Sequence, residues 1–345
     1  METKVENSNR VFSIQLIRVM AMFMIIFDHI LCALPVADLS VIIQVLNSGV
    51  FIFLFLSGIL FGDKEVIDWK KWFGKRFLRI FIPLWIFGIV DMATSYFLWE
   101  TFSPKYILYY LFNIQGIFQG SVASTNLWFV TFIMICYLIT PILQWMKKEN
   151  RQFIRLILIP VIVIQIILAY VTDAGLQSGH TFSWCIIALY IYSLGYFMGV
   201  KRLIKIINPK TAAVSFVVSL AGAFLVLLCN RYMDGTVMYD RVIMPYGMIC
   251  VDLFLVAFCF WIGKMVSHQL IKKIIYFFDK ISYEFYIVHG LIMAAITNEW
   301  LVKYGIVVYI FSTIVLSVIF AYLLNMLANK IIKTIMKLKV KNDGE

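Results

Sequence analysis

Charged residues are scarce in this sequence: Asp, Glu, Lys and Arg make up only 14% of the 345 residues, whereas 62% are hydrophobic. A water-soluble protein of this length could not cover its surface with so few polar groups. The apolar stretches also lack the strict alternation of polar and apolar residues that marks the strands of a membrane β-barrel. The composition therefore excludes a soluble domain, and the missing alternation excludes a barrel.

Residue patterns for metal binding and serine hydrolysis are missing as well. The six cysteines are scattered singly along the chain, as is typical of small packing residues, and no disulfide framework follows from them. No pair of histidines, and no combination of cysteine and histidine, has the spacing of a metal site, and the Gly-x-Ser-x-Gly nucleophile elbow is absent. We therefore expect no bound metal and no serine-hydrolase chemistry.

Linkers and a cleavable leader are also not found. No Ser/Gly-rich linker, low-complexity tract or repeat divides the chain. We therefore expect a single membrane domain over residues 1–345, with tails at 1–10 and 330–345. The first apolar run contains Arg18 and is too long for the apolar region of a signal peptide, so we expect it to stay on the mature protein.

What the chain does contain is a series of apolar runs near twenty residues long. A helix of that length rises about 1.5 Å per residue and crosses a hydrocarbon core of about 30 Å. We therefore predict an all-α, polytopic transmembrane bundle of about ten helices. The predicted spans are residues 11–35, 40–62, 77–99, 127–146, 156–172, 183–200, 211–229, 246–263, 277–298 and 306–329.

The positive residues give this bundle an orientation. If the N-terminus is cytoplasmic, most of the 30 Lys and Arg residues fall in cytoplasmic segments, and the outer segments hold only Lys105, Arg231, Arg241 and Lys303. This bias is the one expected of cytoplasmic loops, so we predict that both termini are cytoplasmic, in a multi-pass protein of the cell membrane. Membrane topology accounts for the net charge of +11 without a nucleic-acid partner.

The outer segment 101–126 is aromatic and longer than the other loops. It is long enough to fold back as an interfacial or re-entrant helix that shapes a binding mouth. A belt of Tyr and Phe at headgroup level would use the same residues, and the sequence leaves both readings open.

The first span carries three ionisable residues, Arg18, Asp28 and His29, although charges are costly inside a membrane. Arg18 and His29 are eleven residues apart, close to three helical turns, so they share a face about 16 Å apart along the axis. An imidazole titrates near neutrality and can take a proton from a hydroxyl nucleophile, so we predict that His29 is a general base. Asp28 points about 100° away, and either orients His29 or pairs with another cation.

Two further sets of residues mark other spans. Arg76 and Arg79 are three apart at the start of the third span, where two guanidinium groups could hold phosphates. An ordinary cluster of cytoplasmic positive charge would have the same residues. The ninth span contains Asp279, Lys280, Glu284 and His289, of which Lys280 and Glu284 are spaced as an intrahelical pair. Single acids at Asp91 and Asp252 fit either a structural hydrogen bond or a lining role.

Five blocks in order make the chain resemble the integral-membrane acyltransferase-3 family. The first helix has an Arg and a His separated by ten residues, and the second ends in the Gly-Val-aromatic run NSGVFIFLFLSGILFG. The third helix opens with Arg-x-x-Arg followed by a proline, a later helix begins Leu-Trp-Phe, and the ninth span has a Ser-Tyr…His pattern. The residues that carry these blocks are Arg18, His29, Ser57, Gly58, Arg76, Arg79, Pro83, Trp128, Pro141, Ser282, Tyr283 and His289.

The resemblance implies transfer of an acyl group, usually acetyl, from cytoplasmic acyl-coenzyme A to a hydroxyl of a glycan or lipid on the outer side. It implies that Arg76 and Arg79 hold the coenzyme phosphates, that Arg18 meets the acyl donor, and that His29 activates the acceptor or relays the acyl group. His289, Glu284, Asp28 and Trp128 are further candidates. The donor, acetyl-CoA or another acyl-CoA, is a substrate, and no permanently bound cofactor is implied.

Two other functions compete with this prediction. In a polytopic transporter, the same intramembrane ions would line a substrate path and no group would be transferred. The chain shows no internal repeat and no pair of broken helices, which weighs against transport. In a purely structural or sensory membrane protein, an intramembrane Arg and His on one face would be an unexplained cost.

Overall fold

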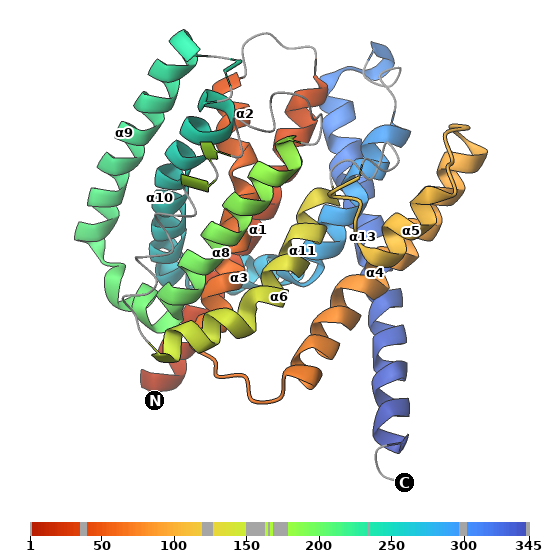
Figure 1. Ribbon diagram of the computed structural model, residues 1–345, viewed down its shortest axis with the longest axis horizontal. Coiled ribbons are helices and arrows are strands. Elements are labelled where there is room, and N and C mark those ends of the chain that lie inside the picture. Colours follow the sequence, from red (N-terminus) through yellow and green to blue (C-terminus); the bar gives the residue numbers. More distant parts are fainter. Residues whose placement is uncertain are drawn as a thin grey trace. The chain divides into compact units, whose positions relative to one another are not determined.

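The computed structural model describes residues 2–34, 40–118, 127–149, 163–164, 166–167, 179–233, 235–236, 238–296 and 302–342. Within these residues the chain forms helices and no strand (Figure 1). The helices are α1 (Glu2–Ala33), α2 (Ser40–Asn47), α3 (Gly49–Gly62), α4 (Trp69–Phe97), α5 (Lys105–Phe112), α6 (Trp128–Glu149), α8 (Gly179–Ile206), α9 (Pro209–Met233), the π-helical turn η2 (Tyr239–Ile243), α10 (Met244–Met265), α11 (Gln269–Ala295) and α13 (Ile306–Asn342).

Eight segments of the described residues are long and apolar enough to cross a membrane. They are Phe12–Ala33, Ile42–Gly62, Trp69–Phe97, Trp128–Lys148, Cys185–Ile206, Pro209–Met233, Met244–Met265 and Ile306–Leu338. Each overlaps one of the predicted spans, so the predicted all-helical, multi-pass membrane fold is confirmed. The direction in which the helices cross stays a prediction.

Two of the ten predicted spans have no counterpart among these eight. Residues 156–172 lie almost entirely outside the described residues. Residues 277–298 fall mostly on α11, which is helical but carries several charged side chains. The helices also run further than the apolar spans: α1 extends into the predicted tail 1–10, and α13 continues through most of 330–345. A hydropathy run marks where lipid is expected and does not mark where a helix ends.

The contacts group the chain into two compact units, one of residues 1–65 and 135–279 and the other of residues 66–134 and 280–345. In the first unit, α1 packs against α3 and α10, and α9 lies along α10 (Figure 1). The prediction of a single membrane domain stays a prediction.

Glycines bring α3 and α8 into close contact within the first unit. A Cβ atom added at Gly58 or Gly62 would collide with the α8 backbone near Tyr196, and one added at Gly195 would collide with the carbonyl oxygen of Phe55. Small residues allow this approach in membrane helices, where packing drives association. Lys147 stabilises the end of α3 by donating to the carbonyl oxygen of Gly62 at 2.6 Å.

In the second unit, α4 begins at a capped residue and packs on two other helices. The side chain of Asp68 accepts a 2.8 Å hydrogen bond from the Lys71 amide and so caps the helix. Further along, α4 packs against α13 around Ile82. The hydroxyl of Tyr110 on α5 donates to the buried carboxylate of Asp91 at 2.7 Å, so Asp91 forms a structural hydrogen bond.

Candidate functional site

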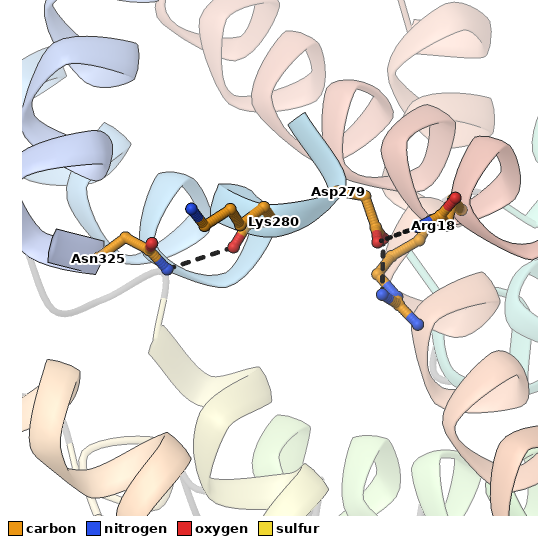
Figure 2. Close-up of polar contacts among 5 residues, drawn as sticks. Arg18, Asp279, Lys280 and Asn325 are labelled. Atoms are coloured by element: carbon orange, nitrogen blue, oxygen red, sulfur yellow. Dashed lines mark hydrogen bonds and ion pairs between the residues drawn. The ribbon is translucent and has the colours of Figure 1, made fainter. Parts of the chain in front are cut away.

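Arg18 on α1 forms an ion pair with Asp279 on α11. Its terminal nitrogen Nη1 donates to the Asp279 Oδ1 atom at 2.6 Å (Figure 2). The Arg18 side chain is 27% exposed and that of Asp279 only 11%. A charge-assisted hydrogen bond of this length, away from bulk water, is one of the stronger polar contacts that a protein makes.

The second oxygen of Asp279 is also occupied from α1. The Gln15 side chain donates from Nε2 to Oδ2 at 3.2 Å. Gln15 and Arg18 are three residues apart and therefore neighbours on one face of the helix. Beside them, the rings of Phe23 and Phe278 meet edge to face with centroids 5.1 Å apart. One carboxylate and one aromatic contact thus hold α1 against the first part of α11.

Asp279 was not among the predicted site residues. Helical spacing shows which residues share a face of one helix, but Asp279 lies more than two hundred residues after Arg18 in the chain. The available signal was an acid inside a predicted span, which needs a cationic or hydrogen-bonding partner somewhere in the fold. The sequence contains several such acids and does not say which of them faces Arg18.

His29 lies further along α1, next to an almost fully buried acid. The side chain of His29 is 20% exposed, whereas that of Asp28 is 7% exposed. The Nε2 atom of His29 lies 3.8 Å from the Asp28 Oδ2 atom, which is within ion-pair range but too long for a hydrogen bond. Asp28 is therefore close enough to stabilise a protonated imidazole without fixing its tautomer.

Arg76 and Arg79 lie in the first turns of α4 in the second unit. Arg76 is half-buried, with its guanidinium 5.1 Å from the ring centroid of Trp72, whereas Arg79 is exposed. When a guanidinium stacks on an indole ring, the ring covers one face of the group. The N–H donors lie in the guanidinium plane and can still bind an oxygen. The helix thus places the two predicted phosphate ligands as neighbours, as their spacing indicated.

Glu284 on α11 lies near Arg79 in the same unit. It is buried, and it is close enough to the Asn325 side chain and to Arg79 for electrostatic interactions. It forms no ion pair with Lys280, whose carbonyl oxygen accepts a 3.2 Å hydrogen bond from Asn325 (Figure 2). The spacing of Lys280 and Glu284 was therefore a poor guide to the partner of this acid.

His289 and Trp128 occupy different surroundings in this unit. His289 is completely buried, and its Nδ1 atom contacts the carbonyl oxygen of Tyr286 one turn earlier. Because a carbonyl oxygen only accepts, the hydrogen of His289 lies on Nδ1. Trp128 is half-buried at the start of α6, where its ring packs edge-on against Phe132.

Comparison with known proteins shows the family of the chain. The profile of one family, described as an acyltransferase domain, matches residues 11–326. The chain belongs to the acyltransferase-3 family. Searches of curated proteins and of solved structures find no match to it.

The candidate residues of this acyltransferase fall into two sets. Arg18, Asp28 and His29 belong to the first unit. The second unit holds Arg76, Arg79, Trp128, Glu284 and His289. Their roles in acyl transfer stay predictions.

Proposed function

We propose that this membrane acyltransferase moves an acyl group, acetyl in the first instance, from cytoplasmic acyl-CoA to a hydroxyl on the outer side of the cell membrane. The acceptor class is a polysaccharide, a lipid-linked glycan or another hydroxylated molecule. The observation that carries the proposal is the family match over residues 11–326 of a chain whose first span holds Arg18, Asp28 and His29.

In this reaction His29 is the general base. Its imidazole takes the proton of the acceptor hydroxyl while the oxygen attacks the thioester carbonyl carbon. The tetrahedral intermediate collapses, the carbon–sulfur bond breaks, and the thiolate of coenzyme A takes the proton back from the imidazolium. The Asp28 carboxylate, 3.8 Å from the Nε2 atom, favours the imidazolium during the step.

Arg18 and the two arginines of α4 serve the donor. The Arg18 guanidinium, about 16 Å from His29 along the helix axis, binds the acyl donor on the cytoplasmic side of the reacting thioester. Arg76 and Arg79 bind phosphate groups through bidentate hydrogen bonds, and the exposed lysines Lys71 and Lys75 strengthen the positive field around them. A thioester is already activated, so the protein needs only to orient it, exclude water and supply the base.

The proposal is tested in membranes that contain the protein, given acetyl-CoA labelled in the acetyl group, with the glycans and lipids of the same cells as acceptors. Wild type transfers label covalently to an acceptor, and His29→Ala abolishes the transfer while the protein remains inserted. His268→Ala, which removes an exposed histidine between α10 and α11, keeps it. Equal labelling by wild type and His29→Ala contradicts the role of His29.

The competing transport function predicts a different result in the same material. A transporter would move a labelled solute across sealed vesicles without forming an ester. The acyltransferase forms label that is covalently attached to an acceptor and is released by mild alkali, as expected of an O-acyl ester. Labelled succinyl-CoA, supplied in place of acetyl-CoA, then tests which acyl group the protein accepts.

A further inference from the structure

The proposed mechanism gives no role to Asp279, the ion-pair partner of Arg18. Both carboxylate oxygens of Asp279 accept from α1: Oδ1 from Arg18 at 2.6 Å (Figure 2) and Oδ2 from Gln15 at 3.2 Å. A carboxylate bound at both oxygens cannot rotate without losing a contact. Asp279 is therefore a rigid anchor for the guanidinium rather than a loose surface partner.

The anchor engages only one end of the guanidinium. The contact runs through Nη1, and the described part of the chain offers Arg18 no other hydrogen-bond or ion-pair partner. A guanidinium has five N–H donors in a planar fork, so one anchored nitrogen leaves the others able to reach an incoming oxygen. The 27% exposure of the Arg18 side chain is consistent with an approachable edge.

We propose that Asp279 is a positioning residue for Arg18. It fixes the direction of the guanidinium and offsets its charge before the acyl donor arrives, so that the remaining N–H groups are already oriented to bind the donor on the cytoplasmic side of the thioester. This inference rests on the proposed acyl transfer. The alternative role for the same ion pair is a clip that only holds α1 against α11.

A double-mutant cycle tests whether Asp279 acts through Arg18. Asp279→Ala lowers kcat/KM for acetyl-CoA about 10²-fold, because a misdirected Arg18 shifts the bound donor, and a displacement of about 1 Å at the reacting thioester can cost that much. Asp279→Asn loses less, since its amide oxygen still accepts from Nη1. In the Arg18→Ala background, Asp279→Ala causes no further loss, because it acts only through the guanidinium. Additive losses overturn the proposal.

A charge exchange tests the clip directly. In the double variant Arg18→Asp with Asp279→Arg, the ion pair can form again but the guanidinium now projects from α11. We expect its thermal unfolding temperature in detergent to recover toward wild type, relative to either single variant, while acetyl transfer stays at least 10²-fold down. Recovery of transfer together with stability means that the pair is only a clip, and overturns the proposal.

The matched control is Glu65→Gln. It neutralises an acid in an exposed ion pair with Lys148, in the same unit, and should change neither transfer nor stability measurably.

Failure of the inference is distinct from failure of the proposed function. A wild-type protein that transfers no acyl group refutes the function, whereas an active wild type with additive losses refutes only the role of Asp279.

Discussion

The hydroxyl of Tyr283 on α11 donates a 2.9 Å hydrogen bond to the carbonyl oxygen of Ile80 on α4. Ile80 directly follows Arg79, and Glu284, which interacts electrostatically with Arg79, directly follows Tyr283. This part of α11 is therefore hydrogen-bonded to the backbone of α4 directly beside Arg79. The relationship gives a structural reason for a tyrosine at this position.

Tyr283→Phe is expected to remove this hydrogen bond and to leave the ring in place. A single hydrogen bond contributes about 0.5–1.5 kcal/mol net, so we expect a small fall in thermal unfolding temperature. Because Arg79 lies beside the bond, KM for acetyl-CoA should also rise several-fold. Tyr276→Phe, on an exposed ring earlier in α11, is the control and should change neither. Identical behaviour of the two variants would remove Tyr283 from the account.

Arg76→Ala and Arg79→Ala are expected to raise KM for acetyl-CoA by about 10-fold or more each, because a hydrogen bond to a charged group contributes about 1.5–3 kcal/mol. Their effect on kcat should be smaller, since phosphates lie away from the reacting carbon. Lys75→Ala, in the same turns of α4, is the control for a simple loss of positive charge.

A shortened donor checks the same assignment. Acetyl-pantetheine carries the thioester without phosphates, so wild type and both arginine variants should use it equally, and poorly. A large difference between them on this donor would show that the two arginines do not act through phosphate.

Gly58→Ala is expected to destabilise the protein, because the added Cβ would overlap the backbone of α8. Overpacking of this kind typically costs about 1–3 kcal/mol, and thermal unfolding in detergent measures it. The control is Gly74→Ala in α4, where nothing lies within 4 Å of the added atom. The control should be neutral or slightly stabilising, because alanine favours a helix over glycine. Similar losses in both variants would contradict the close packing of α3 and α8.

The approximate places of the eight membrane-length segments could be predicted from sequence because lipid imposes one strong rule, about twenty apolar residues for each crossing. The break between α2 and α3 could not be predicted in this way. Both sides of Ser48 are apolar, and the Ser48 hydroxyl donates to the carbonyl oxygen of Val45, a local contact that hydropathy does not record. Similarly, only the short helix α5 forms in the described part of the aromatic segment 101–126.

Some features of the candidate site could likewise be predicted from sequence, and others could not. Periodicity along one helix correctly placed Arg76 beside Arg79, since both lie on one continuous helix. It could not pair Arg18 with Asp279, because the two residues lie on different helices. Helical spacing carries information about a face of one helix, whereas the partner of a buried charge is decided by how helices pack.

The most direct test of the central claim uses sealed inside-out vesicles, in which the cytoplasmic face is outside, and acetyl-CoA labelled differently in its acetyl and coenzyme parts. The account predicts that acetyl label becomes esterified to an acceptor enclosed in the vesicles, that free coenzyme A stays in the external medium, and that His29→Ala abolishes the reaction. Coenzyme label that enters together with the acetyl label, or undiminished transfer by His29→Ala, would contradict it.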